Sequence, residues 1–352
     1  MIQVGTGGFG REWCRSFLPP NVEDGLVEVV AAADVNPAAL ENAREFLALP
    51  AERCYTDVRR AFEEAEADFC TVVVPPSAHE EIVDLALDQG MDILSEKPIA
   101  DTLEASVRIA AKVKAAGRKM GVTMSHRFDR DKTTLRELVR SEDSGPLDYL
   151  VCRFTCDCRK HGDWGAFRHD IPDTLMVEGA VHHLDILADL AGSRCRTICA
   201  RTWNPEWGEF AGDSQGLVLM DFENGARAFY EGAKTNAAGL NWWGNEYIRA
   251  ECRDATLVMN HRRIERFRYP GGQTAEGEGE EVPLLERGKW SHAWLVEKFA
   301  RWLGGGGRME TNVEDNLQSV ALVFSAIESS RRGGPVEVQE FLAEAVARVE
   351  AG

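Results

Sequence analysis

The feature that most constrains the fold is a glycine-rich hexapeptide near the start of the chain. Gly5-Thr6-Gly7-Gly8-Phe9-Gly10 follows a short apolar run, Ile2 to Val4, and opens a helical pattern over Phe9 to Leu18 that ends at Pro19-Pro20. Glycines in the pattern G-x-G-x-x-G allow a tight turn and close packing of the helix on the strand, and they are typical of a βαβ unit. The sequence therefore predicts that the chain begins with a parallel sheet flanked by helices.

The same alternation of short apolar runs and helical patterns continues to about residue 123. Strands are predicted at Val27 to Ala33, Phe69 to Val74, Asp92 to Ser95 and Lys119 to Thr123, with a short, weak one near Cys54. Helices fill the gaps, so residues 1–123 are predicted to form one α/β domain. The first strand is shorter than a typical strand of about five residues, which leaves open a start codon upstream of Met1.

Beyond about residue 124, strands follow one another directly and turn residues separate them. Gly216 to Phe222 and Arg227 to Gly232 flank Asn224-Gly225 and predict a hairpin. Further strands are expected at Tyr247 to Cys252, Thr256 to Asn260 and Ile264 to Tyr269, and helices at Thr174 to Leu190, Ser291 to Trp302 and Val313 to Ser330. Residues 124–352 are therefore predicted to form an α+β domain with a mainly antiparallel sheet, and the Gly- and Glu-rich stretch Gly271 to Gly288 a mobile surface excursion.

Composition excludes several classes of protein. With 40 Lys+Arg against 58 Asp+Glu, the net charge is −18, which argues against nucleic-acid binding because phosphate contacts need a basic face. No apolar run approaches the roughly 18 residues of a membrane span, so we expect a soluble cytoplasmic protein. The nine cysteines suit reduced thiols, and the even spacing of Cys152, Cys156 and Cys158 predicts buried structural thiols on one face of a strand over Val151 to Arg159.

An acidic residue further along the chain supports a nucleotide-binding role for the glycine pattern. Asp34 follows the second predicted strand, where a carboxylate can accept hydrogen bonds from both hydroxyls of a nucleotide ribose. The carboxylate would also repel a 2′-phosphate, and Val35-Asn36-Pro37 offers no Arg or Lys to offset that repulsion. NAD is therefore the predicted cofactor and NADP the less favoured one. The alternative is a glycine turn that binds nothing.

Ordered motifs along the chain resemble the glucose-fructose oxidoreductase, inositol dehydrogenase and rhizopine-catabolism (Gfo/Idh/MocA) family of NAD(P)-dependent oxidoreductases. The triplet Glu96-Lys97-Pro98, after Ser95, is the signature of that family. The resemblance extends over nearly the whole chain, through the glycine loop, Val74-Pro75-Pro76 with His79, Arg127-Phe128, the segment Glu178 to Asp185, and a closing segment from Glu314-Asp315 through Ala326 and Ser329 to Gly333–Val336.

The resemblance implies a Rossmann domain followed by an open-faced sheet domain that is often used for oligomerisation, so a homodimer or homotetramer is expected. It also implies a set of cofactor-binding residues, namely Gly5, Thr6, Gly7, Gly8, Phe9, Gly10, Asp34, Val35, Pro75, Pro76, His79, Glu96, Lys97 and Arg127. The sequence departs from the family pattern at Glu178, which is commonly Asp, and at Ala180, which is usually Gly. Both differences make inositol itself a doubtful substrate.

The predicted catalytic residues are Lys97, His182 and Glu178. Glu178, His182 and Asp185 are spaced i, i+4 and i+7, which places them on one face of a helix, while His183 points about 100° away. A carboxylate one turn from an imidazole can hold it as an acid/base near neutral pH, as removal of a proton from a secondary alcohol requires. Lys97, at the carboxyl end of a parallel strand, can stabilise the developing alkoxide.

The same helix and the residues before it allow other interpretations. A metal site made from Glu178, His182, His183 and Asp185 is not expected, because adjacent histidines point different ways on a helix. Trp164, Arg168 and His169, together with Lys97, His182 and His183, are candidate substrate contacts, as is Asn241-Trp242-Trp243, since sugars stack on aromatic rings and pair with polar side chains. The alternative is that the tryptophans pack the core.

These observations predict an NAD-dependent dehydrogenase that acts on a secondary hydroxyl or ketone of a sugar, polyol or cyclitol-like compound. Two alternatives share the same residues. One is a glycosidase that uses NAD by transient oxidation, and the other is a non-catalytic, cofactor-binding regulatory protein on the same fold.

Overall fold

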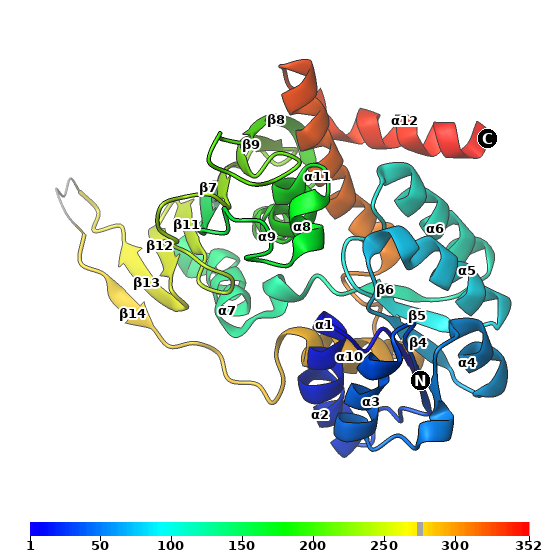
Figure 1. Cartoon of the computed structure of the whole chain (residues 1–352). Helices are drawn as coiled ribbons and strands as arrows, with labels where there is room; N and C mark the ends of the chain where they lie inside the picture. Colours follow the sequence, from blue (N-terminus) through cyan, green and yellow to red (C-terminus); the bar gives the residue numbers. More distant parts are fainter. Residues whose placement is uncertain (273–276, 352) are drawn as a thin grey trace. The chain divides into compact units, whose positions relative to one another are not determined.

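The computed structural model describes residues 1–272 and 277–351, which fold into two compact units, each built on its own sheet (Figure 1). The first unit contains Met1–Ser125 and Gly288–Leu317, and it also contains the chain from Ala345 onward. The second contains His126–Arg287 and Gln318–Glu344. In the described chain, no helix is long and apolar enough to cross a membrane.

The division of the chain differs from the predicted boundary at residues 123 and 124. Residues 288–317 and the C-terminal end, expected in the second domain, belong to the first unit. Helix α10 (Ser291–Leu303) packs there because the Asn21 side chain donates to the carbonyl of Ala293 at 2.8 Å and the ring of Phe299 lies 5.3 Å from that of Phe69. These contacts join segments far apart in sequence, so no local pattern could reveal them.

The sheet of the first unit is parallel and has the strand order β3-β2-β1-β4-β5-β6, which confirms the predicted Rossmann fold. Its strands are β1 (Ile2–Val4), β2 (Ala31–Ala33), β3 (Cys54–Tyr55), β4 (Phe69–Val72), β5 (Asp92–Ser95) and β6 (Met120–Val122). The strand predicted over Val27 to Ala33 is shorter than expected, since only its last three residues pair with β1. The order reverses between β1 and β4, and open α/β sheets bind ligands at such a switch point.

The helices of this unit follow the strands as predicted. They are α1 (Phe9–Glu12), α2 (Pro19–Glu23), α3 (Leu40–Leu47), α4 (Val58–Glu64), α5 (His79–Asp88), α6 (Leu103–Ala115), α10, the start of α11 (Val313–Arg332) and the end of α12 (Val338–Ala351), with short helices η1 (Trp13–Phe17), η2 (Pro37–Ala39), η3 (Ala51–Arg53), η4 (Pro76–Ala78) and η5 (Ser125–Phe128, which runs into the second unit). The helix predicted over Phe9 to Leu18 is present, although from Trp13 it is wound as a π-helix. Side-chain caps begin three of these helices, Asn36 for η2, Asp57 for α4 and Thr102 for α6.

The sheet of the second unit has nine strands in the order β14-β13-β12-β11-β7-β10-β9-β8-β15. They are β7 (Leu147–Thr155), β8 (Cys195–Trp203), β9 (Gln215–Phe222), β10 (Arg227–Ala233), β11 (Tyr247–Cys252), β12 (Ala255–Asn260), β13 (Arg263–Arg268), β14 (Glu280–Val282) and β15 (Val336–Glu337). Its pairs are antiparallel except β7 with β10, which confirms the mainly antiparallel sheet and the hairpin between β9 and β10. The excursion predicted over Gly271 to Gly288 holds β14, and residues 273–276 within it lie outside the described residues.

Helices cover one face of this sheet. Leu150, Cys152 and Phe154 alternate along β7 and are buried beneath α9 (Val181–Ala191), while α7 (Arg130–Val139) packs on β12. The other helices are η6 (Glu142–Ser144), α8 (Ala166–Asp170) and η7 (Leu175–Ala180), the last being a π-helical start to α9. The nine cysteines are free thiols, and Cys152, Cys156 and Cys158 are buried as predicted, although the last two lie beyond the end of β7.

Candidate functional site

The glycine loop joins β1 to α1, and packing explains two of its glycines. A Cβ on Gly5, whose φ is +85°, would lie 2.0 Å from the carbonyl oxygen of Val73, and one on Gly10 would lie 2.3 Å from that of Gly5. Over Gly8, whose φ is +51°, no heavy atom lies within 4 Å of a Cβ position. The loop backbone is therefore packed tightly from below and open at Gly8, as close approach of a pyrophosphate requires.

Asp34, directly after β2, holds this loop. Its Oδ2 accepts hydrogen bonds from the backbone N–H of Thr6 at 2.7 Å and of Gly7 at 3.0 Å. Its Oδ1 accepts from the N–H of Asn36 at 2.9 Å and keeps a lone pair for a further donor. The sequence predicted a ribose contact at Asp34, and the structure adds a second role, since the same carboxylate fixes the glycine loop.

The remaining residues predicted around the cofactor differ in exposure. Thr6 is buried: its hydroxyl donates to the carbonyl of Ala39 at 2.8 Å, its N–H donates to Asp34, and its own carbonyl accepts from Nδ2 of Asn42 at 2.9 Å, so its polar groups bond within the protein. Phe9 and Val35 are exposed, Pro75 is exposed and Pro76 is half-buried at the start of η4. Their side chains lie at the carboxyl edge of the sheet, where the fold binds ligands.

Glu96 of the signature triplet is buried, and its contacts are with the protein. Its Oε1 accepts from Nε1 of Trp13 at 2.9 Å and lies 3.1 Å from Nε2 of His292 on α10. Its Oε2 accepts from the N–H of Lys97 at 3.2 Å. Burial would raise the pKa of Glu96, but His292 and Lys97 hold it below its usual value. The predicted cofactor contact is therefore corrected: Glu96 positions the backbone that carries half-buried Lys97.

His79 is a second correction among the predicted cofactor residues. Its ring is buried, with Nε2 3.0 Å from the carbonyl oxygen of Val74 and Nδ1 3.1 Å from that of Ile99. Both ring nitrogens therefore face backbone, and burial lowers the pKa of this imidazole. His79 links the loops after β4 and β5 and positions them, rather than binding the cofactor itself.

His182, the predicted proton acceptor, lies in the first turn of α9 within an aromatic cluster. Its ring stacks on that of His126, with centroids 3.9 Å apart and planes 10° apart. Trp243 meets both rings edge-on, at 6.1 Å from His182 and 5.5 Å from His126. His182 is buried, so these rings hold its orientation.

Glu178, predicted to orient His182, lies in the π-helical turn before α9. Its Oε1 accepts from Nε of Arg168 at 2.8 Å. A π-helix has i→i+5 hydrogen bonds and less rotation per residue than the α-helix that was assumed for the spacing of Glu178 and His182. The guanidinium shares the charge of the carboxylate, which weakens the pull of Glu178 on a proton at His182.

Arg127 and Asp185 form an ion pair, with Nε of Arg127 3.0 Å from Oδ2 of Asp185. Asp189 lies 3.5 Å from the same guanidinium, and the hydroxyl of Ser319 donates to Oδ1 of Asp185 at 2.5 Å. Burial raises the pKa of Asp185 to about 6 although Arg127 opposes the rise. The cofactor contact predicted for Arg127 is not visible in this unit, where its guanidinium ties η5 to α9.

A buried cluster of charges, unexpected from the sequence, lies beside the stacked histidines. Glu246, fully buried, has Oε2 2.8 Å from Nζ of Lys132 and Oε1 near both His126 and His183. Burial would raise the pKa of Glu246, but Lys132 and the two imidazoles lower it well below its usual range. His183, predicted to contact substrate, has Nδ1 3.0 Å from the hydroxyl of Tyr230 and is fully buried, so that prediction is wrong.

Some of the other candidate substrate residues are partly exposed beside Trp243, and others are buried and bonded to protein groups. Trp164 is half-buried, and its ring lies 5.4 Å from Trp243 and 3.8 Å from the ammonium of Lys234. His169 is buried, stacks on Phe210 at 4.1 Å and faces the carbonyl oxygen of Cys158 at 2.8 Å. Buried Asn241 bonds to protein groups, while Trp242 is exposed. Trp164, Trp243 and Arg168 therefore remain candidates, and His169 and Asn241 are structural.

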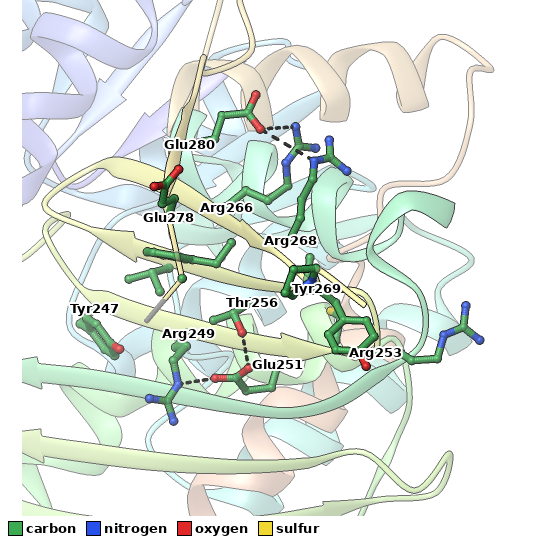
Figure 2. A pocket seen from close by; sticks show the side chains of 16 residues that line it. Tyr247, Arg249, Glu251, Arg253, Thr256, Arg266, Arg268, Tyr269, Glu278 and Glu280 are labelled. Carbon is green, nitrogen blue, oxygen red and sulfur yellow. Dashed lines mark hydrogen bonds and ion pairs between the residues drawn. The ribbon is translucent and has the colours of Figure 1, made fainter. Parts of the chain in front are cut away.

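A recess of about 950 Å³ lies elsewhere, on the opposite face of the second sheet over β11, β12 and β13 (Figure 2). Its charged side chains pair with one another: Nε of Arg249 lies 3.0 Å from Oε1 of Glu251, and Arg266 lies 3.0 Å from Glu280. None of the predicted cofactor, catalytic or substrate residues lines this recess. It is therefore distinct from the candidate site.

Sequence reasoning missed His126, Lys132, Glu246, Trp13 and His292. His126 immediately precedes the Arg127-Phe128 motif, and this position could have indicated that it lies near the site. Glu246 comes directly before a predicted strand and carried no distinctive pattern. His292 meets Glu96 only through packing of α10 on the first unit, which the sequence does not disclose.

Comparison with known proteins gives a consistent picture. Residues 2–124 match the family model described as an oxidoreductase family with an NAD-binding Rossmann fold, and residues 133–252 match the model of the GFO/IDH/MocA C-terminal domain. An uncharacterized protein of Sinorhizobium fredii, y4oX, is 55% identical over 346 residues, which are 97% of this chain and 96% of that protein.

Two further similarities concern proteins named for an activity. Inositol 2-dehydrogenase of Corynebacterium glutamicum is 30% identical over 192 residues, about half of each chain at 53% and 52%. The solved structure of levoglucosan dehydrogenase with NADH and L-sorbose superposes with a TM-score of 0.81 at 17% identity, covering 96% of this chain and 98% of that one. The likeness at this low identity concerns the fold.

Proposed function

The chain belongs to the Gfo/Idh/MocA family of NAD-binding oxidoreductases, and we propose that it transfers hydride between nicotinamide and a secondary hydroxyl or ketone of a sugar, polyol or cyclitol-like substrate. The observation that carries the proposal is the pairing of buried His182 with an aromatic wall of His126, Trp243 and Trp164. Such a wall suits the apolar face of a sugar ring. The similarity to an inositol 2-dehydrogenase supports the same substrate class.

The residues of the first unit fit NAD. The loop around Gly8 is open to a pyrophosphate, and Asp34 offers Oδ1 to a ribose hydroxyl. When bound, NAD supplies the carbon that accepts or returns hydride. Glu96 fixes the backbone of Lys97, so that the ammonium can donate to the substrate oxygen and stabilise negative charge that develops there.

His182 is proposed to take the proton of the reacting hydroxyl. Stacking on His126 holds the orientation of its ring, which proton transfer requires. Glu178 is proposed to tune His182, with its charge moderated by Arg168. The outward face of the second sheet is proposed to join copies of the chain into a homodimer or homotetramer, as the resemblance implies.

The test is turnover by the purified chain on a panel of sugars, polyols and cyclitols, followed by nicotinamide absorbance. On a substrate found this way, His182→Ala and Lys97→Ala should each lower kcat by roughly 10²-fold or more, while the Kd for NAD changes far less. Glu178→Gln should lower kcat less than His182→Ala does. It should also shift the basic limb of the pH–rate profile toward lower pH, because an imidazolium would lose a charged partner.

The control is His161→Asn, which changes an exposed histidine away from the aromatic wall and should leave kcat unchanged. Full activity of His182→Ala would contradict the proposal. Turnover without net accumulation of NADH would indicate transient oxidation instead, and NAD binding without turnover on any substrate would indicate a regulatory protein.

A further inference from the structure

The histidine cluster of the second unit contains three possible metal-ligand atoms at one point. They are Nδ1 of His126, Nε2 of His183 and Oε1 of Glu246, and all lie within 4.8 Å of one another. His183 and Glu246 are fully buried, and 17% of the His126 side chain is exposed. The proposed proton transfer uses His182 and leaves the convergence of these three atoms unexplained.

The separations in this group are too long for hydrogen bonds. Nδ1 of His126 lies 3.4 Å from Oε1 of Glu246, and Nε2 of His183 lies 3.5 Å from the same oxygen. N–H···O bonds in proteins are about 2.7–3.2 Å long. Among the residues that the structure describes, none gives either of these two nitrogens a hydrogen bond of normal geometry.

The two separations from Oε1 of Glu246 match edges of a coordination tetrahedron, and the two imidazole nitrogens lie within 4.8 Å of each other. Zn²⁺ binds imidazole nitrogen and carboxylate oxygen at about 2.0–2.2 Å, which places tetrahedral ligands about 3.4 Å apart. A hydrogen-bonded group would contract below this distance, whereas an ion at its centre would hold it. We propose that His126, His183 and Glu246 bind one divalent transition-metal ion, with Zn²⁺ the best fit to two imidazoles and a carboxylate.

The surrounding groups already orient the ligands. The hydroxyl of Tyr230 lies 3.0 Å from Nδ1 of His183, so a proton on Nδ1 leaves the lone pair of Nε2 toward the metal position. Lys132 holds the other oxygen of Glu246 at 2.8 Å, and the N–H of Gly244 donates to Oε1 at 2.9 Å. Hydrogen bonds of this kind to ligating side chains are usual in metal sites.

The local charge also favours a cation. The ammonium of Lys132 is shared by three carboxylates, with Asp131 at 3.2 Å and Asp129 at 3.5 Å in addition to Glu246. Lys132 and Arg262, which also acts on Asp131, face three acidic groups, so the acidic groups outnumber the two cations in a region where an excess of negative charge is costly.

The site would keep a fourth coordination position, as zinc sites with three protein ligands do when they bind water or substrate. Because His126 stacks on His182, the ion would lie one ring away from the proposed proton acceptor. Metal binding by these three atoms does not require the hydride transfer proposed above, so the two can be tested separately.

The test uses the full chain, stripped of metal with a chelator and titrated with ZnCl₂ by calorimetry in the absence of NAD. We expect one Zn²⁺ per chain, and Glu246→Gln should weaken its Kd by roughly 100-fold or more, since even supporting residues of metal sites cost 10–100-fold. His161→Asn and Cys156→Ser, matched controls for exposed imidazole and buried thiol, should bind as the unmodified chain does.

Absence of stoichiometric Zn²⁺ binding, or unchanged binding by Glu246→Gln, would overturn the proposal. If Glu246→Gln does not fold, X-ray absorption of the unmodified chain loaded with Zn²⁺ decides. A first shell of nitrogen and oxygen alone supports the site, and sulfur in that shell places the ion at thiols and refutes it. If the unmodified chain binds no Zn²⁺ but produces NADH, this inference is refuted and the proposed function is left intact.

Discussion

Asp34 combines two roles in one carboxylate, since it fixes the glycine loop through Thr6 and Gly7 and lies where a ribose is expected. Asp34→Asn keeps the shape and removes the charge that repels a 2′-phosphate. We expect NAD to bind the unmodified chain more tightly than NADP. In the variant, the ratio of the Kd for NADP to the Kd for NAD should fall by about tenfold or more, which corresponds to roughly 1.4 kcal/mol of binding free energy. Calorimetry with both nucleotides measures this, with Asp57→Asn, at the start of α4, as the control. A preference of the unmodified chain for NADP would contradict the prediction.

Gly10 and Gly8 form a matched pair that tests how the loop is packed. A methyl group on Gly10 would collide with backbone atoms of Gly5 at 2.3 and 2.7 Å, whereas one on Gly8 would meet no heavy atom within 4 Å. Gly10→Ala should cost about 1–3 kcal/mol in urea unfolding and weaken NAD binding. Gly8→Ala should lower the free energy of unfolding by about 1–2 kcal/mol at most, because its left-handed φ disfavours a residue with a Cβ. Equal losses for both variants would show that packing does not set the requirement at Gly10.

Local residues of the site were predictable and distant ones were not. Asp34 and the glycines lie within one βαβ unit, so spacing alone predicts that they lie together, and Asp34 does bond to the glycine loop. Glu96 was assigned to the cofactor because nothing nearby in sequence indicates Trp13 or His292 as partners. His183 and His169 were misassigned for the same reason, since the groups that bury them come from other strands and loops.

At the scale of elements, α5 and α6 are joined through two carboxylates of α5, Glu80 and Asp84, the second 2.8 Å from Nζ of Lys112. Glu80 accepts from Nε and Nη2 of Arg108 at 2.8 and 2.7 Å, and Lys112 lies 3.0 Å away. The hydrogen bonds from Arg108, with Lys112, lower the pKa of Glu80 from 4.5 to about 2. Because the pKa is lowered in the folded state, the stabilisation is complete above about pH 4.5 and is lost as pH falls toward about 2.

Glu80→Gln should therefore lower the free energy of unfolding at pH 7 by about 1 kcal/mol or less, since the side chains are partly exposed. The difference from the unmodified chain should shrink as pH falls below about 4.5. Urea unfolding at pH 7, 5 and 3 measures it, and Glu64→Gln, which removes an exposed pair with Arg60, should change stability less. A difference that grows toward low pH would reverse the argued sign.

Elements with strong periodicity were predicted well, and local irregularity was not. The parallel strands and the β9–β10 hairpin follow from apolar runs and turn residues. The π-helical turns over Trp13–Phe17 and Leu175–Ala180 change the rotation per residue without a sequence signal. The spacing inferred for Glu178 and His182 assumed an unbroken α-helix, and the sequence did not reveal the π-helical turn that contains Glu178.

At the scale of the molecule, the outward face of the second sheet carries an apolar row across four strands. Strand register aligns Cys199, Leu219, Phe229 and Val151, from β8, β9, β10 and β7. Leu219 is 56% exposed, and Leu217 on the same face of β9 is 41% exposed. Side chains of this kind on the uncovered face of a sheet suit contact with a second copy, because identical flat surfaces can pair about a twofold axis.

The prediction is that the chain associates through this row, so that its mass in solution is a multiple of 39.0 kDa. Leu219→Lys would place a charge in the centre of the contact, where burial without a partner is costly, and should shift the mass toward the monomer. Light scattering after size exclusion measures both, with Val22→Lys, an exposed apolar residue of α2 in the first unit, as the control. Since the row lies on the face opposite to α9, Leu219→Lys should leave NAD affinity unchanged. An unmodified chain that elutes at 39.0 kDa, or an assembly that persists in Leu219→Lys, would contradict the prediction.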